Sequence, residues 1–115
     1  MNVLTTVQGP VTIVTLTDNR LDAARTVRFK EAIREISDGG ASHIVLDMSA
    51  VTFMDSSGLG AVVAVMKLMG PDKPLELVGL TPTVQKVFRL TKMDTIFRIY
   101  PSLSDVPALI AAKVG

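Results

Sequence analysis

Two short stretches near the start of the chain are rich in β-branched residues. They cover residues 3–7 and 11–16, and Gly9-Pro10 separates them. Valine, isoleucine and threonine favour the extended conformation, whereas a Gly-Pro pair favours a turn. The pattern therefore predicts two antiparallel strands joined as a hairpin.

The spacing of apolar residues then changes to that of a helix. Phe29, Ile33 and Ile36 follow one another at intervals of four and three residues, which places them on one helical face. Asp22 suits the N-cap of this helix, because its carboxylate can accept hydrogen bonds from the free amides of the first turn. The glycine pair at residues 39–40 predicts its end.

Predicted strands and helices alternate in the rest of the chain. The nearly unbroken apolar run at residues 44–48 is typical of a strand that is buried on both faces of a parallel sheet. The later predicted elements are a helix from Ser56 or Asp55 to about Met69, a strand at 75–78, a helix opening at Thr81-Pro82, a strand at 96–100, and a helix over 102–113 that starts at Ser102 or Asp105.

This order of elements indicates an α/β fold. A hairpin followed by alternating strands and helices implies a mixed β-sheet, with the antiparallel hairpin at its N-terminal end and about four helices packed against it. The chain has 115 residues, which is the usual size of one domain. We therefore expect residues 1–115 to form a single domain.

Composition and charge narrow the possible functions. With 12 basic and 11 acidic residues the net charge is +1, which gives no electrostatic case for binding nucleic acid or an anionic membrane. The absence of cysteine excludes disulfides and thiolate metal sites, and a single histidine, His43, excludes a multi-histidine metal site. The start of the chain lacks the features of a signal peptide. We expect a cytoplasmic protein without a cofactor.

The most informative segment is the loop VTFMDSSGLG at residues 51–60. It joins the buried strand to the second predicted helix, at the sheet edge where α/β domains commonly place their sites. Ser56 and Ser57 lie beside free amides and the positive end of the helix dipole, and Gly58 and Gly60 would let another molecule approach the backbone. Alternatively, Ser56 only caps the helix, and the glycines allow it to pack closely on the sheet.

Enzymatic interpretations of this loop fail on the residues around it. A nucleophile elbow needs glycine two positions before the serine, where this chain has Met54. His43 is expected at the opposite end of its strand, too far away to activate Ser56. Asp47 and Asp55 could be imagined as an acid–base pair, but Asp47 fits better as a strand residue with a local hydrogen bond. We therefore predict that the protein is not an enzyme.

The second predicted helix is apolar nearly all the way round. Its one charged residue is Lys67, and apolar residues such as Val65 and Leu68 lie outside its main apolar face. A helix of this kind must be covered on more than one side. Either it is buried between the sheet and the third helix, or an exposed apolar strip on it docks a partner.

The loop resembles the phosphorylation-site motif of bacterial anti-sigma factor antagonists, which are STAS-domain proteins. The matching residues are FMDSSGLG at 53–60, and the resemblance covers nearly the whole chain. It extends to Leu21-Asp22 before the first helix, to the strand at 43–47, to the helix entry at 79–88 and to the last strand at 93–99. Asn19 stands where the family usually has glycine, and asparagine also tolerates a positive φ.

The resemblance implies regulation by partner switching. The unmodified protein binds an anti-sigma factor that is also a serine kinase, and a sigma factor is freed. The kinase uses ATP to phosphorylate Ser56, the phosphorylated form is released, and a PP2C-type serine phosphatase restores it. Ser57 is expected to point back toward the fold. The resemblance and the apolar strip together place five residues on the partner surface: Asp22, Asp55, Ser57, Gly58 and Val65.

Two other functions share parts of this pattern. STAS domains also serve as accessory subunits of membrane lipid transporters and as regulators of signalling or secretion, and the sequence does not distinguish these clients. Acyl-carrier proteins attach phosphopantetheine at an Asp-Ser pair before a helix. Carriers are acidic and all-helical, however, whereas this chain is near neutral and has five predicted strands.

Overall fold

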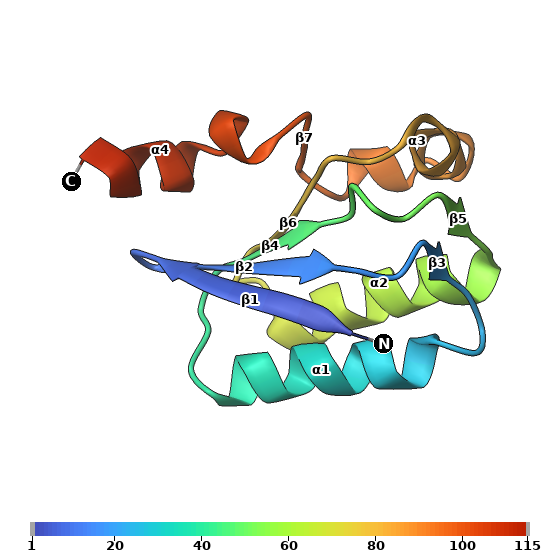
Figure 1. Cartoon of the computed structure of the whole chain (residues 1–115), viewed down its shortest axis with the longest axis horizontal. Coiled ribbons are helices and arrows are strands. Elements are labelled where there is room, and N and C mark those ends of the chain that lie inside the picture. Colours follow the sequence, from blue (N-terminus) through green and yellow to red (C-terminus); the bar gives the residue numbers. More distant parts are fainter. Residues whose placement is uncertain (1, 115) are drawn as a thin grey trace.

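The computed structural model describes residues 2–114, which form a five-stranded mixed β-sheet with helices on both faces (Figure 1). The strands lie across the sheet in the order β1 (Val3–Gln8), β2 (Val11–Leu16), β4 (Ile44–Asp47), β6 (Leu75–Val78) and β7 (Ile99–Tyr100). β1 pairs with β2 antiparallel, and the later pairings in this sheet are parallel. The predicted α/β fold with an N-terminal hairpin is confirmed.

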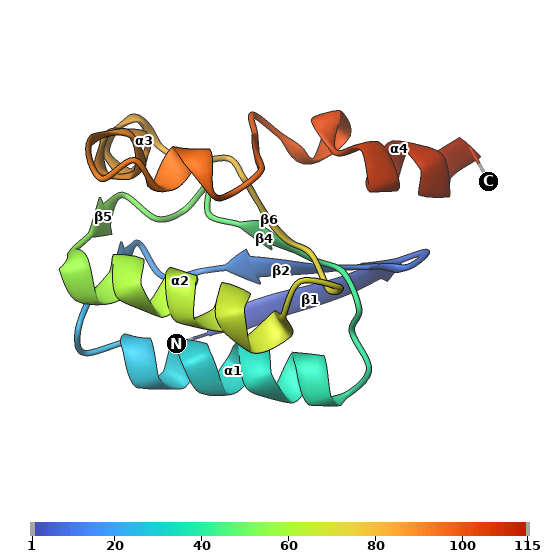
Figure 2. The ribbon, with the colours of Figure 1, turned by 180° about the vertical axis from the view of Figure 1, so that it is seen from behind.

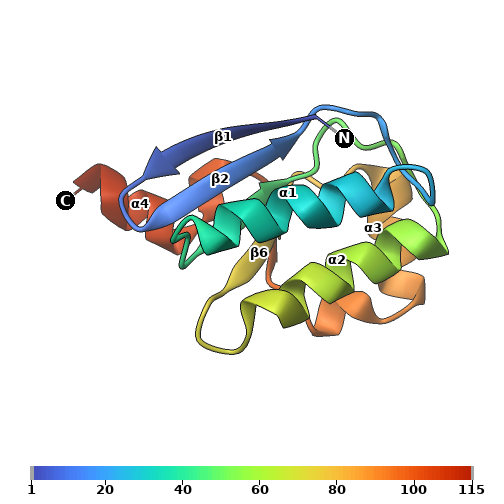
Figure 3. The same cartoon turned by 90° about the horizontal axis from the view of Figure 1, so that it is seen from below.

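Four α-helices lie within the described residues, in agreement with the predicted number. α1 (Thr26–Asp38) and α2 (Ser56–Met69) lie side by side on one face of the sheet (Figure 3). α4 (Pro107–Val114) lies on the opposite face, and α3 (Pro82–Leu90) lies beside the short strand β5 (Phe53–Met54) (Figure 2). Over the same described range, no helix has the length and apolar character that crossing a lipid bilayer requires.

Side chains that alternate along the strands form two apolar clusters, one on each face of the sheet. Leu46 and Leu77 belong to the larger cluster, together with Phe29 of α1 and Val62 of α2. The neighbouring strand residues point the other way, and Val45 belongs to the smaller cluster beneath α4. Burial on both faces explains why the sequence of β4 is almost entirely apolar.

The first helix begins later than the sequence predicted. α1 starts at Thr26, and its N-cap residue, Arg25, makes no side-chain cap hydrogen bond. Residues 22–25 form a turn in which the Arg25 amide donates to the Asp22 carbonyl at 3.0 Å. The predicted N-cap role of Asp22 is therefore wrong, because its carboxylate is engaged by arginine side chains instead.

The C-terminal elements are also shorter than predicted. Of the expected strand at 96–100, only Ile99–Tyr100 pairs with the sheet, because η1 (Met93–Thr95) runs up to it and the Phe97 amide bonds to the Met93 carbonyl. The two predicted starts of the last helix instead cap a short 3₁₀ turn, η2 (Leu103–Asp105). Ser102 is the N-cap of this turn and forms a capping box with Asp105. α4 itself starts at Pro107, a position where the missing N–H of proline is harmless.

The carboxylate of Glu76, on β6, is buried beside the entry end of β4. Glu76 is 5% exposed, and its Oε1 lies 2.5 Å from Nε2 of His43. The Tyr100 hydroxyl donates to the other carboxylate oxygen at 3.2 Å. Burial raises the pKa of Tyr100, and the adjacent Glu76 charge raises it further. His43 is therefore occupied at the end of β4 away from Ser56, as the sequence predicted.

Candidate functional site

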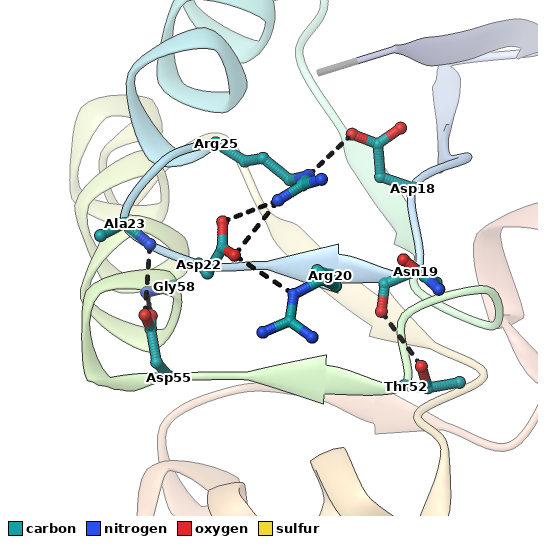
Figure 4. A network of polar contacts seen from close by, with 9 residues as sticks. All are labelled: Asp18, Asn19, Arg20, Asp22, Ala23, Arg25, Thr52, Asp55 and Gly58. Carbon is teal, nitrogen blue, oxygen red and sulfur yellow. Dashed lines mark hydrogen bonds and ion pairs between the residues drawn. The ribbon is translucent and has the colours of Figure 1, made fainter.

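A small second sheet joins the motif loop to the segment before α1. β3 (Arg20–Leu21) pairs parallel with β5, so that Arg20 lies beside Phe53 and Leu21 beside Met54. Neither two-residue strand was predicted from the sequence. The pairing brings two segments more than thirty residues apart into one surface, which Figure 4 shows from close by.

Hydrogen bonds fix the start of the motif loop in place. The Asn19 carbonyl accepts from the Thr52 amide at 2.9 Å and from the Thr52 hydroxyl at 3.2 Å. The Thr81 hydroxyl donates to the Val51 carbonyl at 2.7 Å, which ties the loop to the beginning of α3. Among the described non-glycine residues only Lys92 has a positive φ, so the turn at Asn19 does not use the backbone conformation expected there.

Asp55 is the N-cap of α2. One oxygen of its carboxylate accepts from the Gly58 amide at 2.8 Å, which settles the choice between Ser56 and Asp55. The other oxygen accepts from the Ala23 amide at 3.2 Å (Figure 4). The same carboxylate thus holds the first turn of α2 and binds it to the turn before α1.

Ser56 and Ser57 are the first two residues of α2, and both are exposed. Their position puts both side chains at the positive end of the helix dipole. The expectation that Ser57 points back toward the fold is wrong, because Ser57 lies on the surface as Ser56 does. Exposure alone therefore does not select one serine, and a partner could contact either.

The two glycines of the motif have different environments. Gly58 is buried, and a Cβ placed on it would lie 2.0 Å from the Leu21 carbonyl oxygen. Gly58 therefore lets α2 approach β3, in agreement with the packing interpretation. The expectation that its backbone is open to a partner is wrong. Gly60 is exposed and a Cβ there would meet nothing within 4 Å.

Asp22 is the centre of an ionic network on the β3 side. Nη1 of Arg25 lies 3.1 Å from each of its carboxylate oxygens, and Nε of Arg20 lies 3.3 Å from one of them. Nε of Arg25 also lies 3.3 Å from Asp18 (Figure 4). Partial burial raises the pKa of Asp22, but the hydrogen bonds from Arg25 and Arg20 outweigh it and hold the pKa below its usual value.

An aromatic side chain on this surface was missed by the sequence analysis. Phe53 is 39% exposed, and the Arg20 guanidinium lies 4.2 Å from the centre of its ring. Aromatic side chains and arginine are enriched at protein–protein interfaces relative to the rest of the surface. The signal that could have found the pair is positional, since each residue stands two places before an aspartate of the site, Asp22 or Asp55.

The expected docking role of Val65 is wrong. Val65 is 1% exposed and belongs to the larger apolar cluster with Ala61, Val62 and Met69 of the same helix. On the outer side of α2, Leu68 is 43% exposed. Only one face of the second helix therefore belongs to the core, and of the two residues singled out in the predicted strip only Leu68 remains on the surface.

Each of the three aspartates near the motif loop has a hydrogen-bond partner that stabilises the fold. Oδ1 of Asp47 accepts from the Ser49 amide at 3.0 Å, which is the predicted local hydrogen bond. Asp55 caps α2, and Asp22 binds arginines. Among the described residues, no group of three or more His, Cys, Asp or Glu side chains is placed to hold a metal ion.

Comparisons of sequence and structure with known proteins find the same family. A family model of the STAS domain matches residues 2–106. The anti-sigma-F factor antagonist RsfB of Mycobacterium tuberculosis is 27% identical over 95 residues, or 83% of this chain and 76% of the relative. An anti-sigma-B factor antagonist of Staphylococcus aureus is 25% identical over 100 residues, or 86% and 92%. The crystal structure of an anti-sigma factor antagonist from Mycobacterium paratuberculosis superimposes with a TM-score of 0.84 at 27% identity, over 97% of this chain and 93% of that one.

Proposed function

Because the chain belongs to the STAS-domain family, we propose that it is an anti-sigma factor antagonist that works by partner switching. In this proposal the unphosphorylated form binds an anti-sigma factor that is also a serine kinase, and a sigma factor is freed. Transfer of the γ-phosphoryl group of ATP to the Ser56 hydroxyl then releases the protein. A PP2C-type serine phosphatase hydrolyses the phosphoserine and restores binding in the cytoplasm.

The observation that carries this proposal is the exposed N-terminus of α2, where Ser56 is the serine that corresponds to the phosphorylated residue of the family motif. Ser56 is the exposed first residue of α2, directly after the Asp55 cap and beside the β3 segment. A kinase can reach the hydroxyl without unfolding the helix, because no residue of the first turn has to move to expose it. The helix N-terminus also tolerates the resulting phosphate, since its free amides and dipole favour a negative charge.

The charges around Ser56 explain why phosphorylation would release a partner. A phosphoserine adds about −1.5 to −2 charges at neutral pH. The nearby cations Arg20 and Arg25 already bind Asp22 and Asp18, so the fold offers no unengaged arginine of this network to neutralise the phosphate. A partner packed on the surface would have to remove water from that charge beside Asp55. The added charge therefore weakens the interface more than it weakens the fold.

The partner surface in this proposal comprises Asp22, Asp55, Ser56 and Ser57, together with Phe53 as its apolar residue. Asp55 directly precedes Ser56 and Ser57 at the start of α2, and Asp22 follows β3, the strand that pairs with β5. Phe53 of β5 is 39% exposed and can be buried by a partner. The protein acts in this scheme as a binding partner and substrate of the kinase, and not as an enzyme.

Identification of the bound protein tests the function. The tagged full chain, its Ser56→Ala and Ser56→Asp variants, and the control Ser42→Asp are used to capture proteins from the cells of origin. Ser42 is exposed just before β4, at the opposite end of that strand from the site, so the control adds the same charge elsewhere. We expect the wild type, Ser56→Ala and Ser42→Asp to retain an anti-sigma factor with a kinase domain, and Ser56→Asp to retain much less.

Two results would contradict the proposal. Retention of a transporter subunit in place of an anti-sigma factor would assign the chain to another branch of STAS-domain regulation. Equal retention on Ser56→Asp and Ser42→Asp would remove Ser56 from the interface. Aspartate carries one charge and fewer acceptor oxygens than phosphate, so a partial loss on Ser56→Asp agrees with the proposal.

A further inference from the structure

The outer edge of the sheet is formed by β1, which has a free side along its whole length. β1 is the first strand in the sheet order and pairs only with β2 in the described structure (Figure 3). It is six residues long, and its register with β2 is regular from end to end. Leu4 is 63% exposed and Val7 is 71% exposed. A long, regular strand of this kind presents a row of unpaired backbone donors and acceptors.

The sequence of this edge lacks the features that usually prevent strand pairing. The first charged side chain of the chain is Asp18, so β1 and β2 carry no lysine or other charge. β1 also contains no proline and no bulge. Natural edge strands commonly use a charge, a proline or a bulge to block association. An uncharged edge neither repels a second copy of itself nor selects a partner of opposite charge.

The hydrogen bonds of the hairpin show which backbone groups are free. The Thr17 amide donates to the Asn2 carbonyl at 3.3 Å, whereas the Thr12 amide of β2 donates away from β1, to the His43 carbonyl, at 2.9 Å. In an antiparallel pair the backbone groups of alternate residues point to the same side. The even-numbered residues of β1 therefore bond to β2, and the odd-numbered residues present their groups outward: Val3, Thr5 and Val7.

We propose that β1 is a dimerisation edge, which pairs antiparallel with β1 of a second copy of this chain around a two-fold axis at Thr5. In this register Thr5 faces Thr5 of the second copy, and Val3 faces Val7. Both are pairs of outward-pointing residues, so each exchanges two backbone hydrogen bonds, and the two sheets become continuous. Val7 gains a β-branched cross-strand neighbour, and Leu4 is covered by Thr6 on the other face.

The self-facing position of Thr5 provides a charge-exchange test on the full chain. We expect the wild type to change from monomer to dimer between micromolar and millimolar concentration in sedimentation equilibrium. Thr5→Lys and Thr5→Glu each place like charges directly opposite one another and should raise the dimer dissociation constant about tenfold or more. An equimolar mixture of the two variants should restore dimerisation. Ala64→Lys, which adds a charge at an exposed position of α2, should dimerise like the wild type.

Hydrogen exchange of the wild type gives an independent measurement that needs no variant. The amides of Val3, Thr5 and Val7 should become about tenfold better protected as the concentration passes the dimerisation midpoint, because only the dimer bonds them. A chain that stays monomeric, a dimer that Thr5→Lys does not weaken, or protection of these amides that does not depend on concentration would each overturn the proposal. Ser56→Asp should leave dimerisation unchanged, so this result is separate from the regulatory function.

Discussion

At the scale of single residues, the two glycines of the motif provide a matched pair. Gly58→Ala places a methyl group 2.0 Å from the Leu21 carbonyl oxygen, and backbone must move to accommodate it. We expect the substitution to lower the free energy of unfolding by about 1–3 kcal/mol. Gly60→Ala enters open space within the helix and should raise that free energy by up to about 1 kcal/mol. Urea denaturation of both variants measures the difference.

If Gly58→Ala were as stable as Gly60→Ala, the close contact between α2 and β3 would not exist in solution. The alternative interpretation of the sequence, in which Gly58 opens the backbone to a partner, would then regain support. A loss of stability in Gly58→Ala but not in Gly60→Ala agrees with the role of Gly58 in the close packing of α2 on β3.

The network around Asp22 predicts a pH-dependent contribution to stability. The pKa of Asp22 lies below the ordinary value of 3.8, because hydrogen bonds from Arg25 and Arg20 outweigh the opposing effect of burial. A group whose pKa is depressed in the folded state stabilises the fold above its unfolded pKa, and this contribution is lost as the pH falls through the folded pKa. Asp22→Asn should therefore be less stable than the wild type at about pH 7, and the difference should vanish in acid.

Chemical denaturation of the wild type and Asp22→Asn across the acid range checks this expectation. Asp72→Asn, at an exposed position in the turn before β6, serves as the control for removing a carboxylate. A stability difference that stays constant from neutral pH to pH values below 3.8 would show that Asp22 acts through something other than its charge.

The residues of the site could be predicted in part from the sequence. Asp55 before the serines was one of two proposed caps, because a short acidic side chain suits that position. The exposed ring of Phe53 was missed, because phenylalanine is among the residues most often buried. The turn at 22–25 was missed as well. An aspartate before a helical pattern suggests an N-cap, and the sequence does not show that this carboxylate binds the side chains of Arg20 and Arg25 instead.

At the scale of elements, the apolar residues of α2 differ in exposure, since some are buried in the core and others lie on the surface. Val65 is 1% exposed, so Val65→Ser should lower the free energy of unfolding by about 1–3 kcal/mol through a lost apolar contact and a buried hydroxyl. Leu68→Ser changes an exposed side chain and should alter that free energy by about 0.5 kcal/mol or less. Thermal unfolding and partner titration of both variants distinguish the core from a docking surface.

A stable Val65→Ser variant would restore the docking interpretation of this side chain. A Leu68→Ser variant that folds normally and binds the partner less tightly would instead locate the apolar part of the interface one turn farther along α2.

The elements that could be predicted are those with a long, regular pattern. β2, β4 and β6 follow from unbroken or alternating apolar runs, and the start of α3 follows from Thr81-Pro82. β3 and β5 could not be predicted, because two residues carry no periodicity and their pairing depends on the whole fold. The strand predicted at 96–100 was too long for a related reason, since the local apolar pattern does not show that η1 takes up the preceding residues.

At the scale of the whole molecule, the site lies at the N-terminal ends of the two helices that share one face of the sheet. α1 and α2 share one face of the sheet, and the β3–β5 pair joins their N-terminal ends, with Asp55 bonded to both segments (Figure 4). A charge added at Ser56 therefore changes the surface without displacing a core residue. This separation of surface from core is what a reversible switch requires, because the protein must stay folded in both forms.

The most direct test of the switch is phosphorylation by the partner kinase, followed by measurement of binding. The wild type, Ser56→Ala and Ser57→Ala are incubated with the kinase and ATP, the phosphate is located by mass spectrometry, and the affinity of each product is titrated. We predict one phosphate, on Ser56, and an affinity reduced about tenfold or more in the phosphorylated wild type and Ser57→Ala. Ser56→Ala should stay unmodified and bound. Phosphate on Ser57, or a phosphorylated protein that binds as tightly as before, would contradict the account.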